Sequence, residues 1–206
     1  VEIIESRIET SWALGISAND SSLVVERSMI YGNALGGIDI DDSAFTIRNN
    51  FILVNGRAGI SGTAWGGVRI VNDQAVASQE LSFNTITENQ VRNDAPRGSN
   101  LHCWTRAKMV ASNNIVANGY PYGETNLSGT CEFRYSYVEG GAIFSGPGNI
   151  DAAPLFVDPG ISDFHLLPGS PGEGAADPNA TLSIDFDGDA RPLGTGRDIG
   201  ADEIVP

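Results

Sequence analysis

A six-residue pattern, Ser/Asn-x-Ile/Val-x-x-Asn, returns at regular spacing along the chain. If the Ile or Val of each copy is taken as a marker, the markers stand at positions 8, 30, 52, 86, 115 and 138, so they are 22, 22, 34, 29 and 23 residues apart. A base period near 22 residues, lengthened in two of the turns, is typical of a solenoid. The full copies begin at Ser28, Asn50, Asn84 and Asn113, and degenerate copies begin at Ser6 and Ser136.

A short run of alternating apolar residues precedes each marker. Such alternation predicts a strand with one buried face. A repeat of this length is too short for two helices and a turn, but it suits a coil of two or three short strands separated by bends. Coils stacked about 4.8 Å apart then form hydrogen bonds along the stack. The alternating pairs are Leu23 and Val25, Phe45 and Ile47, Leu81 and Phe83, Met109 and Val110, and Cys131 and Phe133.

The first residue of each copy is Ser or Asn, and stacking places these residues in one column. We expect an inward-facing ladder at a bend, in which each side chain bonds the coils above and below and no buried polar group is left unpaired. Asn also tolerates the left-handed backbone that a bend requires. The predicted ladder consists of Ser6, Ser28, Asn50, Asn84, Asn113 and Ser136.

A second apolar strand is expected eight residues after several markers. Ile16, Ile38 and Ile60 stand there, and each follows a Gly. We interpret them as equivalent core positions of three successive coils.

Several short segments after residue 147 complete a resemblance to a known group. With the repeats, they make the chain similar to the right-handed parallel β-helix repeat proteins of the pectate-lyase-like superfamily, and the closing part resembles that of bacterial cell-surface members with a choice-of-anchor type of closing segment. The segments are Gly-Asn-Ile-Asp (148–151), Asp-Ala-Ala-Pro-Leu-Phe-Val-Asp-Pro (151–159), Asp-Phe-His-Leu-Leu-Pro-Gly-Ser-Pro (163–171), Asp-Gly-Asp-Ala-Arg-Pro (187–192) and Asp-Ile-Gly-Ala-Asp-Glu (198–203).

The resemblance implies an all-β fold, a right-handed parallel β-helix of about six coils. We expect the coils in residues 1–146 and an irregular C-terminal cap, packed on the last coil, in residues 147–206, within one structural domain. No cap precedes Val1, so we expect either that earlier coils are missing from the sequence or that another chain stacks on the open coil. The resemblance says little about activity, because one scaffold carries many functions.

Composition limits the partners of the chain. A hydrophobic content of 41% with only 18% charged residues excludes a disordered chain. The net charge of −14 opposes nucleic acid, anionic membrane surfaces and polyuronates, unless calcium bridges acid to acid. No apolar run approaches 18 residues, so membrane insertion is not expected. We expect a secreted or cell-surface bacterial protein whose partner is a polysaccharide or cell-surface glycan.

Two cysteines, Cys103 and Cys131, stand 28 residues apart. Cysteines on neighbouring coils can meet the distance limit for a disulfide, but Cys131 aligns with Lys108 and not with Cys103. Two interpretations stay open, a disulfide and a pair of buried thiols. A disulfide would agree with an extracellular location.

A segment near the C-terminus, residues 185–192, has carboxylates at alternate positions around a Gly. Asp185, Asp187 and Asp189 are therefore candidate calcium ligands, although the position that holds a Glu in a complete calcium loop is Gly196. The alternative is a structural turn in which Arg191 pairs with an Asp. No cofactor is required, and Ca²⁺ is an optional ligand.

Aromatic and basic residues gather on the inserted loops of adjacent coils. The candidate substrate-binding residues are Trp65, Arg69, Arg92, Arg97 and Trp104. Indole rings stack on the apolar faces of sugars, and Arg binds hydroxyls or carboxylates. The alternative is that both Trp side chains pack the loops against the body.

The resemblance also raises the question of catalysis. Lyases on this scaffold need a base and a cation or Arg that stabilises the enolate. The candidate catalytic residues are Lys108, Arg106 and His102, with an acid from a neighbouring coil. However, we expect Met109, Ala111 and Ser82 to point outward on the same coils. That face then lacks the charged groups that a lyase groove needs.

Three functional hypotheses follow. The leading one is a non-catalytic extracellular module for adhesion or glycan binding along the wall of inserted loops. The second is a polysaccharide lyase, epimerase or glycosidase. The third is a subunit of a fibre that stacks end to end through its first coil.

Overall fold

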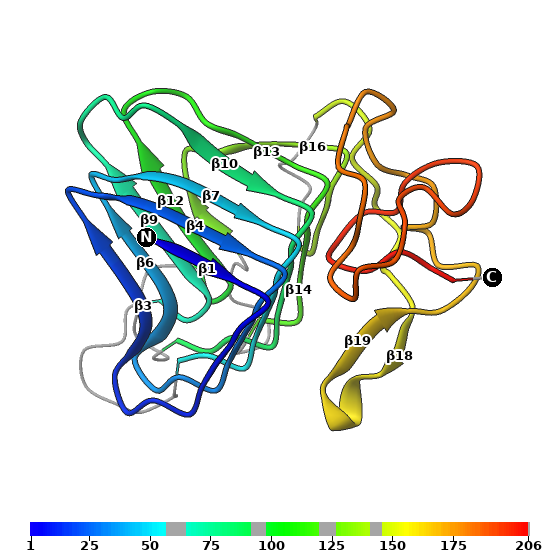
Figure 1. Cartoon of the computed structure of the whole chain (residues 1–206), viewed down its shortest axis with the longest axis horizontal. Helices are drawn as coiled ribbons and strands as arrows, with labels where there is room; N and C mark the ends of the chain where they lie inside the picture. Colours follow the sequence, from blue (N-terminus) through cyan, green and yellow to red (C-terminus); the bar gives the residue numbers. More distant parts are fainter. Residues whose placement is uncertain (57–64, 92–97, 120–126, 141–145, 206) are drawn as a thin grey trace.

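The computed structural model describes residues 1–56, 65–91, 98–119, 127–140 and 146–205. Its strands stack into three parallel sheets that enclose one interior (Figure 1). Every pairing between neighbouring strands of these three sheets is parallel, and consecutive strands of one sheet come from consecutive coils. The predicted fold class is therefore confirmed: the chain is a right-handed parallel β-helix. No helix among the described residues is long and apolar enough to cross a membrane.

The strands are short, and each of the first five coils contributes one strand to each sheet in turn, while the sixth contributes a strand to sheets A and B among the described residues. Sheet A consists of β1 (Glu2–Ile4), β4 (Ser22–Glu26), β7 (Ala44–Arg48), β10 (Gln79–Ser82), β13 (Val110–Ser112) and β16 (Glu132–Arg134). Sheet B consists of β2 (Arg7–Glu9), β5 (Met29–Tyr31), β8 (Phe51–Leu53), β11 (Thr85–Thr87), β14 (Ile115–Ala117) and β17 (Tyr137–Val138). Sheet C consists of β3 (Leu14–Asn19), β6 (Gly36–Asp41), β9 (Val68–Asn72), β12 (Leu101–Thr105) and β15 (Leu127–Gly129).

The predicted Ser/Asn ladder is present, with one residue exchanged. Asn50 Nδ2 donates to Asn84 Oδ1 at 3.0 Å, and Asn84 Nδ2 donates to Asn114 Oδ1 at 3.0 Å. The prediction of Asn113 was wrong by one position. Asn113 has a left-handed backbone (φ 59°) like Asn49 before Asn50, and its side chain points away from the interior to accept from the Asp177 amide.

This correction makes the repeat more regular. Ladder residues are 22, 34, 30 and 22 positions apart from Ser28 to Ser136, so the second and the fifth coil share one period. The marker of the fifth coil is accordingly Val116, which pairs with Ile86, and not Ile115. The buried marker column is Ile30, Ile52, Ile86, Val116 and Val138.

A second ladder follows the last residue of the repeated pattern. Asn33, Asn55 and Asn89 bond one another in the same way, with Nδ2···Oδ1 distances of 2.9 and 3.0 Å. The next rung is Asn100, which comes from the segment before β12 and accepts from Asn89 Nδ2 at 2.8 Å. Asn118, the last residue of the fifth copy of the pattern, has a left-handed backbone (φ 49°), like Val54 and Glu88, which directly precede Asn55 and Asn89.

The second apolar strand is also present, with one member changed. Ile16 pairs with Ile38, as predicted, but the partner of Ile38 in the next coil is Val68. Ile60 lies outside the described residues. The inserted segment between β8 and β9 therefore contained a false copy of the Gly-Ile signal.

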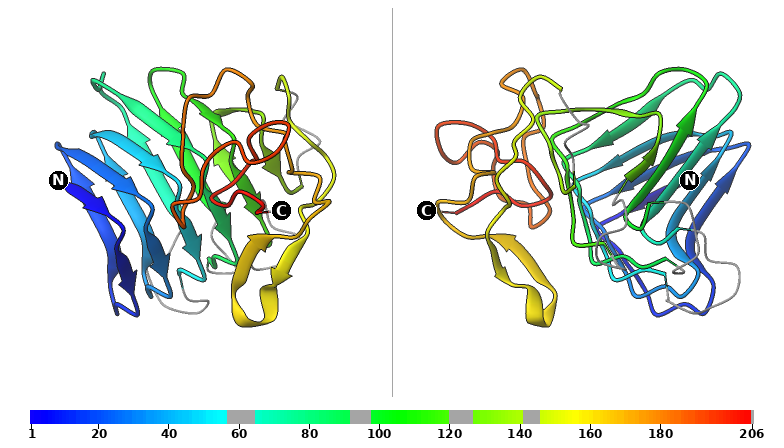
Figure 2. Two further views of the ribbon diagram at one scale, coloured as in Figure 1. Left: turned by 45° about the vertical axis from the view of Figure 1, so that its right-hand side comes forward. Right: turned by 180° about the vertical axis from the view of Figure 1, so that it is seen from behind.

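The C-terminal part differs from the predicted cap. Residues 146–150 do cover the last coil, because Ser136 N donates to Asn149 Oδ1 at 3.0 Å and Ile150 bridges to Tyr137. Residues 151–205, called the C-terminal lobe below, lie instead along the outer side of sheet B (Figure 2). The lobe contains a hairpin of β18 (Phe156–Asp158) and β19 (Asp163–Leu166), joined through a short 3₁₀ helix at Pro159–Ile161.

Apolar residues on the outer face of sheet B explain this position. Phe51 and Leu53 point away from the solenoid interior yet are 1% exposed, because Phe164, Phe186 and Ala201 of the lobe pack on them. A strand that is buried on both faces is apolar throughout, as Phe51-Ile52-Leu53 is. The lobe therefore covers a face that would otherwise expose a large apolar patch.

Cys103 and Cys131 form a disulfide, with their Cα atoms 5.8 Å apart. The open alternative of two buried thiols is thereby excluded. The chain turns at Gly129, the last residue of β15, where a Cβ atom would lie 1.6 Å from the carbonyl oxygen of Cys103. Only glycine permits this approach, and it brings Cys131, directly before β16 of sheet A, next to Cys103 on β12.

Candidate functional site

The outer face of sheet C carries two columns of mainly polar side chains. Alternation along each strand sends residues such as Ile38 and Ile40 into the core and the residues between them outward. Parallel register then aligns the outward residues of successive coils. One column is Ser17, Asp39, Arg69, His102 and Ser128. The other is Asn19, Asp41, Val71 and Trp104.

Arg69 lies at the centre of this face and pairs with two carboxylates of the preceding coil. Its guanidinium contacts Asp39 Oδ1 at 2.5 Å and Asp41 Oδ2 at 3.1 Å. Burial acts to lower the pKa of Arg69, but the hydrogen bonds and charges of the two aspartates outweigh it, so the pKa is raised. The pairing neutralises the Arg and leaves the face without excess positive charge.

Trp104 ends the second column and is 52% exposed. It is exposed because β15 ends at Gly129, opposite Cys103, and offers no residue opposite Trp104. On the same strand His102 approaches Ser128, with a distance of 2.8 Å between Nδ1 and Oγ. The side chains of His102 and Trp104 leave the same face about 6.6 Å apart along the strand. An aromatic platform therefore adjoins hydrogen-bonding groups.

The other predicted sugar-binding residues do not join this face. Trp65 is 8% exposed, and its ring occupies the space beside Gly36, where a Cβ atom would meet it at 2.3 Å. Trp65 therefore follows the alternative interpretation, in which its side chain packs the chain against the solenoid. Arg92 and Arg97 lie outside the described residues.

Three long connections run from sheet B to sheet C in successive coils, and each includes residues outside the described ranges. They join β8 to β9, β11 to β12 and β14 to β15. All three therefore start and end at the same corner of the solenoid, beside the face that carries Arg69 and Trp104. We expect the wall of loops at this corner, and this expectation stays a prediction.

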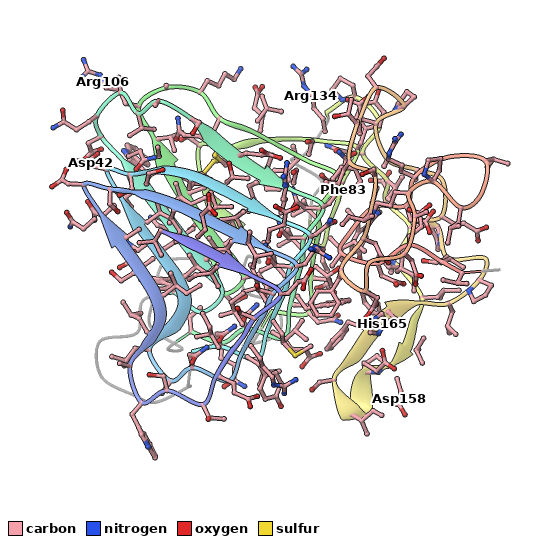
Figure 3. All side chains as sticks on the ribbon, viewed as in Figure 1. Asp42, Phe83, Arg106, Arg134, Asp158 and His165 are labelled. Atoms are coloured by element: carbon pink, nitrogen blue, oxygen red, sulfur yellow. A yellow bond between two sulfur atoms is a disulfide. The ribbon has the colours of Figure 1, made fainter. Side chains whose placement is uncertain are left out.

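The candidate catalytic residues Lys108, Arg106 and His102 do not form one site. Lys108 makes an ion pair with Glu132 of the next coil. Arg106 lies on the turn that leaves sheet C, at a corner of the solenoid away from the C-terminal lobe (Figure 3). His102 belongs to the sheet C face. Lys108 and Glu132 place a cation beside a carboxylate at the surface, while His102 and Arg106 lie on sheet C and on the turn that leaves it.

The sequence missed a groove between sheet A and the C-terminal lobe. Its volume is about 500 Å³. We expected Met109 and Ala111 to make the outer face of these strands poor in functional groups. This expectation was wrong, because both side chains point inward and are at most 2% exposed. The residues that line it include Glu26, Arg48, Glu80, Ser82 and Ser112 from sheet A, and Asp177, Asn179 and Thr181 from the lobe.

Polar contacts inside the groove are mostly internal to sheet A. Arg48 pairs with Glu26 at 3.1 Å, and Ser82 Oγ donates to Glu80 at 2.7 Å. The register that produces them could be predicted from the repeat, since Glu26 and Arg48 are one period apart. The position of the lobe, which turns a sheet face into a groove, gave no local signal.

The acidic motif at Asp185 is a structural turn. Asp185 is fully buried and accepts from the amides of Asp189 and Glu203 at 2.8 and 3.0 Å. Arg191 is buried as well and pairs with Glu203 at 3.2 Å, not with an Asp side chain. The three predicted calcium ligands are therefore not brought together: Asp187 turns to His165, with 3.0 Å between Oδ2 and Nε2, and Asp189 is exposed.

A comparison with protein-family models matches residues 1–140 to the right-handed β-helix region. The chain belongs to the right-handed β-helix family. No curated protein and no solved structure is significantly similar to this β-helix chain. The family match covers all three sheets and ends before the C-terminal lobe. It establishes the scaffold, and function has to be argued from the surfaces that this β-helix presents.

Proposed function

We propose that this β-helix is a secreted or cell-surface module that binds a glycan, without catalysis, on the outer face of sheet C. The observation that carries the proposal is the exposed Trp104 side chain at the end of one of the two columns of mainly polar side chains. An exposed indole beside hydroxyl, imidazole and carboxylate groups suits a sugar, whose ring faces are apolar and whose edges carry hydroxyls. The disulfide supports the extracellular location.

The charge of the face selects among glycans. Arg69 is already paired with Asp39 and Asp41, so these three residues sum to one negative charge. The whole chain has a net charge of −14. Both facts oppose an anionic polysaccharide and favour a neutral glycan, whose hydroxyls donate to the aspartates.

A glycan array followed by calorimetry on the strongest ligand tests the proposal. Trp104→Ala should weaken binding by about fivefold, since stacking on an aromatic ring contributes about 1 kcal/mol. The matched control is Trp12→Ala, because Trp12 is 80% exposed but lies outside the sheet C strands, between β2 and β3. An array without neutral-glycan ligands, or equal affinities for wild type and Trp104→Ala, would refute it.

A second candidate function is hydrolysis or elimination in the groove beside sheet A. It is favoured by one observation, that two carboxylates and an Arg, Glu26, Glu80 and Arg48, line a 500 Å³ groove. Paired carboxylates are the groups that glycosidases use. Its test is turnover on a panel of neutral and acidic polysaccharides. Activity that Glu80→Gln abolishes and Trp104→Ala leaves intact would establish this function in place of the first.

A further inference from the structure

Three segments of the C-terminal lobe meet beside sheet B and bring together an imidazole and two carboxylates. His165 comes from β19, Asp187 from the turn after Phe186, and Asp202 from the last residues of the chain. One ligand atom from each of the three lies within 4.8 Å of the others. In Figure 3, His165 lies on the side of the lobe that faces the solenoid. The glycan site proposed above is on another sheet, so this cluster is independent of it.

We propose that His165, Asp187 and Asp202 bind a divalent transition-metal ion of the zinc class. One imidazole nitrogen and two carboxylate oxygens are a common ligand set for such ions, and a water completes the coordination. Metal–ligand bonds of about 2.1 Å place the ligand atoms of a tetrahedral site about 3.4 Å apart. The observed 3.0 Å between His165 Nε2 and Asp187 Oδ2 is close to that separation.

The second nitrogen of His165 is already held in the manner that metal sites use. Asp163 Oδ1 lies 2.6 Å from His165 Nδ1, which favours a proton on Nδ1 and directs Nε2 to the cluster. A carboxylate that accepts from a metal-binding histidine fixes its tautomer and strengthens the ligand. Asp163 and His165 alternate on one strand, so this orientation follows from the β19 backbone.

The remaining ligand is also fixed by its surroundings. Asp202 is 7% exposed and accepts from the Leu166 amide at 2.6 Å. Burial raises the pKa of Asp202 to about 6, and the charges of Asp185 and Asp187 also raise it. The Leu166 amide and the charge of His165 act in the opposite direction. A bound cation would relieve this crowding of carboxylates.

The rings around His165 limit the access of water from the solenoid side. Phe51 of β8 packs edge-on against the imidazole with 5.0 Å between ring centroids, and Phe186 packs at 6.5 Å. Phe51 and Phe186 also contact each other. An apolar wall of this kind strengthens metal–ligand interactions. A metal ion there would hold β19, the Asp187 turn and the chain end together against sheet B.

Metal titration of the whole chain, freed of metal with a chelator, tests the site. ZnCl₂ should bind with one-to-one stoichiometry in calorimetry and raise Tm, because an ion that binds the folded state alone stabilises it. Asp187→Asn should weaken Zn²⁺ binding at least tenfold without unfolding the chain, since the Asp187 side chain is 46% exposed. Asp163→Asn, which alters only the partner of His165, should weaken it by about 10- to 100-fold.

The matched control is Asp189→Asn, which removes an exposed carboxylate two residues from Asp187. It should bind Zn²⁺ as the wild type does, and CaCl₂ should not compete. Equal Zn²⁺ affinity for wild type and Asp187→Asn would refute the site. The site would also be refuted if the chain bound Ca²⁺ in preference to Zn²⁺ and Asp189→Asn abolished that binding. The metal would then be bound by the carboxylates of the 185–189 turn.

Discussion

At the scale of single residues, the backbone at each bend decides which Asn is a rung. The residue before a rung is in the left-handed region, as Asn49 (φ 54°), Phe83 (φ 53°) and Asn113 (φ 59°) are, and the next residue turns inward. The sequence predicted Asn50 and Asn84 correctly because no other Asn followed them. It failed at Asn113-Asn114, where both residues suit either position and only pairing with Asn84 distinguishes them.

Replacing a central rung should be costly. Asn84 accepts from Asn50 Nδ2 and donates to the Ile47 carbonyl and to Asn114, all in the dry interior. Asn84→Ala leaves several buried polar groups unpaired, so we expect a loss of more than about 3 kcal/mol in the free energy of unfolding. Urea denaturation measures it. Asn179→Ala, at an exposed Asn, is the control and should change stability by less than about 0.5 kcal/mol.

Glu88 makes stability depend on pH. Burial raises the pKa of Glu88 above its ordinary value of 4.5, and the charge of Glu139 adds to the rise. The folded state therefore holds this proton more tightly than the unfolded state, and stability falls as pH rises from about 4.5 through the raised pKa. Glu88→Gln should be more stable than wild type at pH 7 and equal to it near pH 4.

Thermal unfolding of both proteins across this pH range is the measurement. Glu2→Gln, at an exposed residue of β1, removes the same charge and controls for net charge. If the two substitutions raise stability equally at pH 7, the effect belongs to net charge and not to the burial of Glu88.

At the scale of strands, two features decided what could be predicted. Alternating runs such as Phe45-Thr-Ile47 indicated one buried face and were assigned correctly. The run Phe51-Ile52-Leu53 is apolar at every position, which signals burial on both faces, but a short run does not say what covers the second face. Ile60 was a false copy because a Gly-Ile pair alone does not identify the partner of Ile38, which is Val68.

The disulfide joins elements that the strand register alone keeps apart. It links β12 of sheet C to Cys131, directly before β16 of sheet A, and closes 28 residues, for which the loss of unfolded-state entropy corresponds to about 3.6 kcal/mol. Cys103→Ala combined with Cys131→Ala should therefore lower Tm by several degrees relative to the oxidised wild type. Differential scanning calorimetry with and without reductant measures it. A reductant effect that persists in the double variant would contradict the assignment.

At the scale of the whole molecule, the β-helix supplies its own core and the C-terminal lobe closes one side of it. Core residues such as Ile30, Ile52 and Ile86 contact one another down the stack, so the solenoid could be predicted from a repeat. The lobe lacks a repeat, and its position depends on contacts such as Ala201 with Thr85, 116 residues apart. Contacts of that range leave no periodic signal, and this is why a cap on the last coil was predicted in place of a lobe beside sheet B.

Arg191 organises the lobe, and its loss should release the lobe first. Its guanidinium donates to the carbonyls of Asp198 and Gly200 and pairs with buried Glu203. Arg191→Met leaves Glu203 buried without its partner, at a cost of about 3–5 kcal/mol. We expect cleavage within residues 151–205 by a low dose of protease while the strand signal in circular dichroism persists. Arg134→Met, at an exposed Arg, should resist cleavage like the wild type.

The proposed function depends on sheet C presenting Trp104 to a sugar. In the Trp12→Phe variant, Trp104 is the one tryptophan left with more than 8% exposure, since Trp65 is buried. Acrylamide quenching of its fluorescence therefore reports on this face. We predict that a saturating neutral glycan, identified on the array, protects the fluorescence from quenching. Unchanged quenching under conditions where calorimetry shows full binding would contradict the account.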